Sequence, residues 1–266
     1  MRKLTIGLIF TICIITAVCA SSAIAGNSNP DLVVTYGETT YANQQYVNSV
    51  NNYFASKGYT NLGNANTEVI SASQVNAISQ GISGKTYNSN QIFSSALVDL
   101  NQGDNLKVTV DSSKITLVTA KMYASALESA GIQKGIVYVT SPISATGESA
   151  LAGVMSCYEK ATNVEIPQEV KQAANEEIYV QAEVVNNTNA NPDQISQIVD
   201  DVKGEVEKQN ITDMQSIVDV VNETAQKYNI QISNADIEKI AEAIYNTFNV
   251  QDQANAYKDK LEAVLS

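Results

Sequence analysis

The chain of 266 residues contains no histidine and no tryptophan, and it has only three cysteines and four prolines. Catalytic systems that join a serine or cysteine nucleophile to an imidazole base are therefore excluded. Zinc and non-haem iron sites with histidine ligands are excluded as well. Any catalysis would have to use carboxylates, hydroxyl groups, tyrosines or lysines.

The N-terminus has the pattern of a secretory signal peptide. Met-Arg-Lys precedes an apolar segment from Leu4 to about Cys19, which ends in the small residues Ala23-Ile24-Ala25. This order predicts cleavage after Ala25, so residues 1–25 are expected to be a signal peptide and the protein to be secreted or associated with the cell surface. An uncleaved N-terminal anchor is the alternative. No later segment is apolar enough to span a membrane, so no span is expected after cleavage.

Cleavage would remove Cys13 and Cys19 and leave Cys157 as the single cysteine of the mature chain. An internal disulfide is then excluded, and the fold must rely on its apolar core. Cys157 stands in an apolar helical pattern, which is typical of a small buried hydrophobic residue. A reactive thiol is the less favoured alternative.

Acidic residues are concentrated toward the C-terminus. Residues 26–160 contain 9 acidic and 7 basic side chains, whereas residues 161–266 contain 19 acidic and 7 basic ones. Glycine also becomes rare beyond Thr162, where helical periodicity takes over. We therefore predict an α/β domain over residues 26–162 and an acidic α-helical region over residues 163–266. Such a charge argues against nucleic acid and anionic lipid as partners.

Strand and helix patterns alternate in the first region. Strands are predicted at Leu32–Tyr36, Leu106–Val110 and Ile136–Val139, where β-branched and aromatic residues cluster. Helices are predicted at Tyr41–Lys57, capped by Thr39 or Thr40, and at Ala120–Ala130. The order is not strictly strand–helix–strand, which favours an α/β (α+β) fold with a mixed sheet and packed helices.

A β-hairpin is predicted between strands at Gln91–Leu100 and Leu106–Val110, because Asn101–Asn105 has the composition of a turn. Asp99, Asn101 and Asp104 are spaced like part of a calcium loop. The glutamate that completes such a loop is missing, so a plain turn is favoured and no metal is assigned. No cofactor is expected either.

The acidic region predicts an all-helical appendage. A helix at Gln168–Val185 is followed by four apolar stripes at helical spacing, in residues 195–206, 214–228, 237–248 and 254–264. Cap-like residues precede three of the stripes, at Asn191-Pro192, Thr212-Asp213 and Asn234. Short connections and the lack of a lasting heptad argue against a coiled coil. Asn186, Asn210 and Asn222 begin Asn-x-Thr sequons and are candidate glycosylation acceptors.

The best candidate site is the loop Ser141–Glu148 (SPISATGE), which joins a strand to a helix where α/β proteins place ligands. Its hydroxyl groups and the free N–H groups of the following helix could hold an anion or a carbonyl group. The candidate ligand-binding residues are Ser141, Ser144, Thr146, Gly147 and Glu148. The simpler interpretation is that Thr146 caps the helix and Pro142 ends the strand.

A second motif, Gly81–Thr86 (GISGKT), ends like a phosphate-binding loop. The complete motif needs a glycine at position 79, where this chain has Ser79, and an apolar strand before it. A glycine-rich turn is therefore favoured.

Six segments carry a resemblance to a known family: VTYG at 34–37, SSAL at 94–97, ITLVT at 115–119, MYASALESAGI at 122–132, VYVTSP at 137–142 and TGESALAGV at 146–154. In this order they resemble the secreted bacterial and archaeal proteins of domain-of-unknown-function family 1002. The family usually reads GTAALTG where this chain has GESALAG, from Gly147 to Gly153. The resemblance covers nearly the whole mature chain and implies an extracellular protein without an assigned activity.

Together these patterns favour a secreted or cell-surface protein that binds a cell-envelope component or another surface protein and is not an enzyme. The alternative is an extracellular hydrolase that uses carboxylates or a Ser/Thr–Lys pair in place of histidine. Its site would lie around Ser141–Glu148.

Overall fold

A computed structural model describes residues 29–79, 81–82, 84–188 and 190–266. The proposed signal peptide, with Cys13 and Cys19, lies outside the described residues. Five strands form one mixed sheet in the order β2-β1-β3-β5-β4, in which β1 and β2 are parallel, β4 and β5 are parallel, and β3 is antiparallel to β1 and β5. The strands are β1 (Asn29–Gly37), β2 (Ala65–Ile70), β3 (Ser95–Asp99), β4 (Leu106–Val110) and β5 (Gly135–Thr140). The predicted mixed sheet is confirmed.

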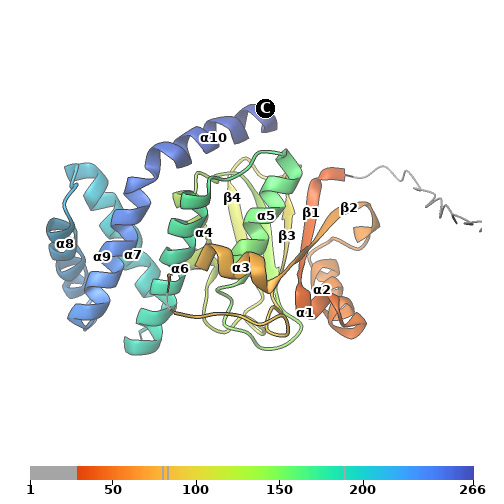
Figure 1. Cartoon of the computed structure of the whole chain (residues 1–266), viewed down its shortest axis with the longest axis horizontal. Coiled ribbons are helices and arrows are strands. Elements are labelled where there is room, and N and C mark those ends of the chain that lie inside the picture. The colour runs from red at the N-terminus through yellow and green to blue at the C-terminus, as the bar shows by residue number, and fades with distance from the viewer. Residues whose placement is uncertain (1–28, 80, 83, 189) are drawn as a thin grey trace, which may run out of the picture.

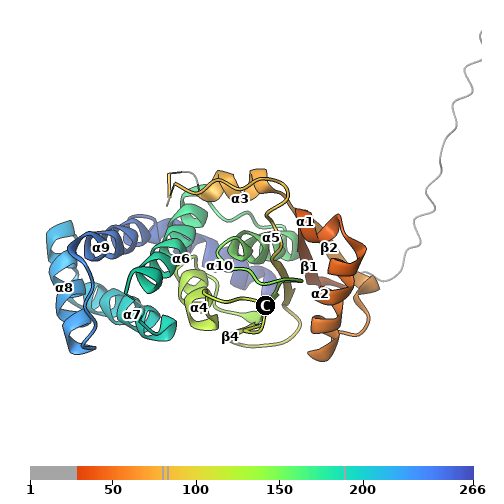
Figure 2. The same cartoon turned by 90° about the horizontal axis from the view of Figure 1, so that it is seen from below.

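Helices cover both faces of the sheet because its strands carry apolar residues on both sides (Figures 1 and 2). Val33 and Val98 face α4 (Ala120–Ser129) and α5 (Ala150–Thr162). Val34 and Leu97, the alternate residues, pack against α2 (Gln44–Ser56). The remaining helices of this part are α1 (Glu38–Tyr41), the 3₁₀ turn η1 (Leu62–Asn64) and α3 (Ala72–Ser79).

The C-terminal part is all helical, as predicted. Its helices are α6 (Gln168–Thr188), α7 (Pro192–Gln209), α8 (Met214–Lys227), α9 (Asn234–Asn249) and α10 (Gln251–Leu265). α6 lies beside α3, α4 and α5 on one side and α7 and α9 on the other, and α8 lies farthest from the sheet (Figure 1). One apolar cluster extends from Val33 of β1 to Leu261 of α10, so the two parts share a core. None of the described helices is both long and apolar enough to cross a membrane.

Capping side chains set several helix starts. Asn191 and Asp213 accept backbone N–H groups at the starts of α7 and α8, as the sequence indicates. The cap of α9 is Ser233, one residue before the expected Asn234. The cap of α2 is Asn43 instead of Thr39 or Thr40, because the buried hydroxyl of Thr40 donates to the carbonyl oxygen of Phe93 at 2.6 Å.

The predicted hairpin between β3 and β4 is wrong. β5 lies between these two strands, and Val137 of β5 pairs with Val98 on one side and Val108 on the other. The segment after β3 therefore crosses the end of β5, where Gly103 (φ +94°) lies close to the Ile136 side chain. Turn composition correctly marks a change of direction, but it does not tell whether the next strand pairs with the previous one.

The docking of α10 can be tested at Gly131, which follows α4 with φ +82°. A Cβ atom there would meet the carbonyl oxygen of Ala254 in α10 at 2.4 Å, whereas a Cβ at Gly58 (φ +104°) would meet nothing within 4 Å. Alanine at either position costs about 1 kcal/mol in backbone strain. We expect Gly58→Ala to lower the free energy of unfolding by about 1 kcal/mol and Gly131→Ala by about 3 kcal/mol, because the latter also displaces α10.

Urea unfolding followed by circular dichroism measures both losses. Equal losses at Gly131 and Gly58 would contradict the packing of α10 against the end of α4.

Candidate functional site

The loop Ser141–Glu148 is joined to the segment that precedes α4. The Thr116 N–H donates to the carbonyl oxygen of Ala145 at 2.9 Å, and the Val118 N–H donates to that of Thr146 at 3.0 Å. Ala145 in turn donates to the carbonyl oxygen of Lys114 at 2.9 Å. These bonds use backbone groups of the loop that a ligand would otherwise meet.

The five candidate residues of this loop do not converge on one space. Ser144 and Thr146 are exposed, whereas Ser141, Gly147 and Glu148 are buried. The Ser141 hydroxyl has no hydrogen-bond partner among the described residues. The interpretation of Thr146 as a helix cap is wrong, because α5 begins at Ala150 after Ser149, which makes no side-chain cap bond.

Packing explains the glycine of this loop. Gly147 has φ +109°, and a Cβ atom there would lie 2.6 Å from Cγ2 of Ile115. The fully buried hydroxyl of Tyr123 donates to the Gly147 carbonyl oxygen. Burial raises the pKa of Tyr123 well above its usual value, so it remains a neutral donor. Gly147 is therefore required by the close approach of neighbouring groups.

The two sequence motifs meet in an ion pair. Oε1 of Glu148 accepts a hydrogen bond from Nζ of Lys85, the lysine of the GISGKT segment, at 2.9 Å. The Glu148 side chain is 1% exposed and that of Lys85 is 50% exposed. Burial by itself would lower the pKa of Lys85, but its hydrogen bond to Glu148 and the charge of that carboxylate raise it. Lys85 is therefore a cation that neutralises a buried carboxylate.

Two tyrosines extend this cluster toward the helical part. The Tyr179 hydroxyl on α6 donates to the Tyr87 hydroxyl at 2.7 Å. Nζ of Lys85 lies 5.6 Å from the centre of the Tyr179 ring, a cation–π distance. Burial is the main cause that raises the pKa of both tyrosines. α6 thus helps to enclose the Lys85–Glu148 pair.

A serine–lysine pair lies at another place, between α4, α6 and α7. Nζ of Lys203 is 2.6 Å from Oγ of Ser125 and 3.0 Å from Oε1 of Glu177. Asp200 lies 3.6 Å from the same ammonium group, and Ser125 is only 3% exposed. A serine nucleophile activated by lysine needs a neutral amine and access to substrate, whereas this lysine sits between two carboxylates. Because Ser125 and Lys203 are 78 residues apart, no local motif reveals their contact.

Two of the calcium-like residues, Asp99 and Asn101, are used in structural hydrogen bonds. Asp99 is 4% exposed, and its carboxylate accepts from the Asn101 N–H at 2.9 Å and from the Tyr59 hydroxyl at 3.0 Å. Asp104 is exposed. Within the described ranges, no group of three or more Asp, Glu, Cys or His side chains is arranged to hold a metal ion.

Cys157 is buried on α5, as predicted. Its sulfur lies 3.7 Å from both the Val33 carbonyl oxygen and the Thr35 hydroxyl. Burial raises the pKa of this thiol to about 12. The thiolate is therefore scarce at neutral pH.

The three sequon asparagines, Asn186, Asn210 and Asn222, are exposed. Thr224 of the third sequon is 4% exposed. Glycosylation at these positions stays a prediction.

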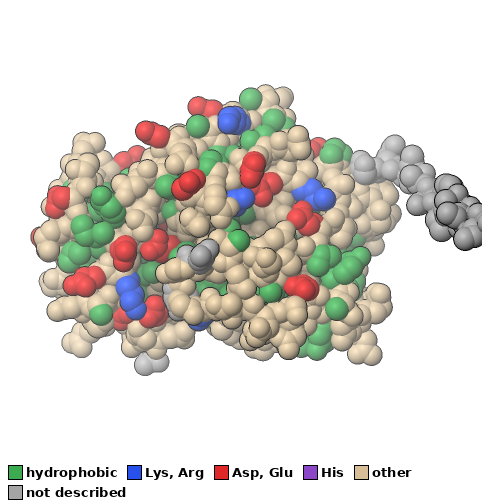
Figure 3. Space-filling view, in the orientation of Figure 1, with side chains coloured by type: hydrophobic (Ala, Val, Ile, Leu, Met, Phe, Trp, Pro, Cys, Tyr) green, Lys and Arg blue, Asp and Glu red, His purple; other side chains and the backbone are tan. Residues whose placement is uncertain are grey.

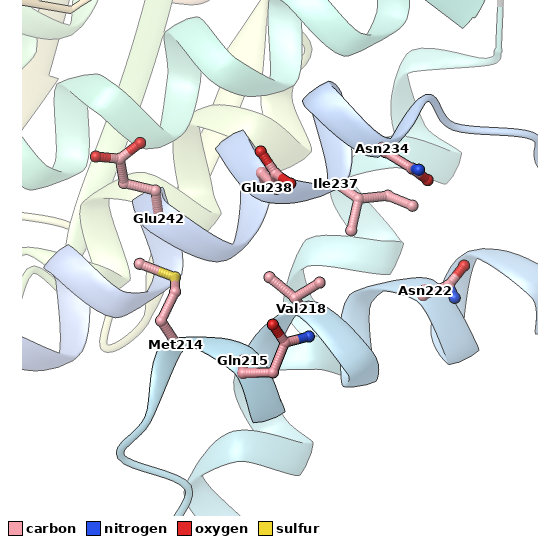
Figure 4. A pocket seen from close by; sticks show the side chains of 8 residues that line it. All are labelled: Met214, Gln215, Val218, Asn222, Asn234, Ile237, Glu238 and Glu242. Atoms are coloured by element: carbon pink, nitrogen blue, oxygen red, sulfur yellow. The ribbon is translucent and has the colours of Figure 1, made fainter.

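A groove on the helical part was not signalled by the sequence. It lies between α8 and α9 and has a volume of about 520 Å³ (Figure 4). Met214, Val218 and Ile237 supply its apolar lining, and Glu238 and Glu242 supply carboxylates. An apolar stripe looks the same in sequence whether its whole width is covered or part of it stays open, which explains why the groove was missed.

Fold and site together define an α/β protein with a mixed five-stranded sheet and an acidic all-helical C-terminal part. A family model described as a protein of unknown function (DUF1002) matches residues 36–264, so the chain belongs to this family and the resemblance is confirmed. An uncharacterized protein of Bacillus subtilis (strain 168), YpuA, is 28% identical over 191 residues. That match covers 68% of this chain and 63% of the relative, so the chain spans less than two thirds of its length. No solved structure matches.

The Lys85–Glu148 pair can be tested by a double-mutant cycle. Lys85→Met leaves the buried Glu148 carboxylate without a cation, so we expect a loss of about 2 kcal/mol in the free energy of unfolding, less than for a fully buried pair because Lys85 is half exposed. Glu148→Gln should cost about 1 kcal/mol. The double variant should lose little more unfolding free energy than Glu148→Gln alone, because the glutamine at position 148 carries no charge that needs Lys85 as a partner.

Urea unfolding near neutral pH measures the cycle. Lys208→Met, at a 75% exposed lysine paired with Glu205, serves as the control and should leave stability unchanged. Additive losses at Lys85 and Glu148 would contradict the coupling.

Proposed function

We propose that this protein is a secreted or cell-surface binding module that associates with the cell envelope or with another surface protein, and that it does not act as an enzyme. The single observation that carries the proposal is where the chain places its reactive groups. Glu148 is closed off by Lys85, and Ser125 and Glu177 lie around Lys203 in the core. Groups that could replace histidine in catalysis thus serve as structural partners.

The expected secretion rests on the leader-like pattern of residues 1–25. A binding role is supported by the α8–α9 groove, whose volume lies within the range of known ligand sites. The groove is formed by α8 and α9, whereas the cluster around Lys203 lies between α4, α6 and α7. Binding and structural roles are therefore carried by separate parts of the molecule.

A second function, an extracellular hydrolase, is favoured by one observation, the 2.6 Å contact between Ser125 and Lys203. This function requires α7 to move away so that substrate reaches Ser125. A fluorophosphonate probe, which labels activated serines, separates the two functions. We expect no labelling of the native protein, because Ser125 is 3% exposed.

Labelling that disappears in Ser125→Ala but persists in the control Ser144→Ala, at an exposed serine of the loop, would favour the hydrolase and contradict the proposed binding role.

The proposed localisation is tested by fractionating cells that express the full chain. We expect a product cleaved after Ala25 in the medium or the envelope fraction. Leu8→Arg breaks the apolar segment of the leader and should leave the uncleaved chain inside the cell. Thr5→Ser, a change in the same segment that keeps its pattern, is the matched control. Uncleaved wild-type protein in the cell interior would refute the secreted address.

A further inference from the structure

The groove between α8 and α9 is lined by residues 214–222 of one helix and 234–242 of the other. Met214 lies by Glu242 at one end, and Asn222 lies by Asn234 at the other (Figure 4). From Met214 to Asn222 the groove spans about two helical turns, roughly 12 Å. Helices α6 and α7 contact the α8–α9 pair on its inner side. A third helix laid along the groove would extend this bundle by ordinary helix packing.

The edge of the groove is acidic. Glu238 and Glu242 are exposed and lie one turn apart on α9. Neither forms an ion pair within the part of the chain that the structure describes. Lys239, which lies between them in the sequence, pairs instead with Glu183 on α6. Like charges at this spacing destabilise an isolated helix. A cation placed over α9 would relieve this repulsion.

The acidic edge continues toward α6. Glu242 also borders a second hollow of about 310 Å³, which Glu176, Glu183 and Lys239 line, with Glu183 paired to Lys239. Burial and the nearby charge of Glu242 raise the pKa of Glu176, although its hydrogen bond from Asn246 opposes the shift. In Figure 3, apolar side chains gather over α8 and α9 with carboxylates beside them. An occupant of the groove therefore meets apolar surface at the centre and negative charge along one side.

We infer that the groove between α8 and α9 binds a basic amphipathic helix of a partner protein. Its apolar side chains would cover Met214, Val218 and Ile237, and its lysines or arginines would pair with Glu238 and Glu242. This is the helix-in-groove mode of recognition, in which Met214 supplies an adaptable surface. The inference rests on the proposed binding function and names the class of partner.

Charge decides against the other occupants. Residues 161–266 carry 19 acidic and 7 basic side chains, so a second copy would bring mainly like charge to the groove. Nucleic acid and anionic lipid would meet the same repulsion at Glu238 and Glu242.

The test uses the full chain and a synthetic peptide of about 18 residues, with leucines at helical spacing and lysines flanking them. The same peptide with glutamate in place of lysine is the control probe. Methyl resonances of labelled methionine report the place of binding, because Met214 lines the groove while Met122 and Met155 are fully buried. We expect the basic peptide to shift the Met214 methyl signal, assigned with Met214→Leu, and to leave the Met122 and Met155 signals in place.

Matched variants test the acidic edge. The double variant Glu238→Gln/Glu242→Gln should weaken the Kd roughly fivefold, as expected for two exposed ion pairs. Glu207→Gln/Glu262→Gln removes the same charge from exposed positions on α7 and α10 and should change the Kd by less than about twofold. Val218→Ser should also weaken binding, with circular dichroism as the check that it folds.

Three results would overturn the inference. The first is that the Met214 signal does not shift. The second is equal weakening by both double variants, which would indicate attraction by net charge alone. The third is a dimer in sedimentation that Val218→Ser abolishes, which would identify a second copy as the occupant. Secretion without peptide binding would refute the inferred role of the groove and leave the proposed secretion standing. Peptide binding by a chain that is not secreted would refute the proposed secretion and leave the role of the groove standing.

Discussion

The burial of α6 on nearly all sides is the constraint that organises this structure. Helices α3, α4, α5, α7, α9 and α10 all contact it, so its polar side chains must find partners within the protein. Glu177, 1% exposed, accepts hydrogen bonds from Ser125 and Ser129 on α4 and pairs with Lys203 on α7. Asn175, also buried, donates to the Ile78 carbonyl oxygen of α3. Each bond restricts how a neighbouring helix can lie on α6, because breaking it would strand a buried polar group.

The need for buried partners also explains the structure of the loop Ser141–Glu148. The buried carboxylate of Glu148 requires a cation, and Lys85 pairs with it while its ammonium group lies over the Tyr179 ring of α6. Charged and hydroxyl groups that would suit catalysis are thereby used to join the sheet domain to the helices. Helix α8 lies farthest from this network, and the groove between it and α9 leaves part of their apolar surface open. The geometry thus separates a hydrogen-bonded centre around α6 from an open groove between α8 and α9.

Much of the architecture could be predicted because it depends on local patterns. The periodicity of Ile195, Val199, Val202 and Val206 defines a buried face of α7 in any packed arrangement. The hairpin prediction failed because the turn after Asp99 has the same composition whether β4 pairs with β3 or passes beyond β5. Local pattern marked Ser141–Glu148 as a loop between a strand and a helix, but the burial of Glu148 and the exposure of Thr146 depend on residues distant in sequence.

Residue types and their spacing were enough to predict most of the helices and strands, the mixed α/β class, the family and the absence of histidine chemistry. The strand order, the Lys85–Glu148 pair, the Ser125–Lys203 contact and the open groove between α8 and α9 emerge only in the folded chain. Buried charges and apolar faces need partners, and many residues could serve. Which residue does so is fixed only when the whole chain packs.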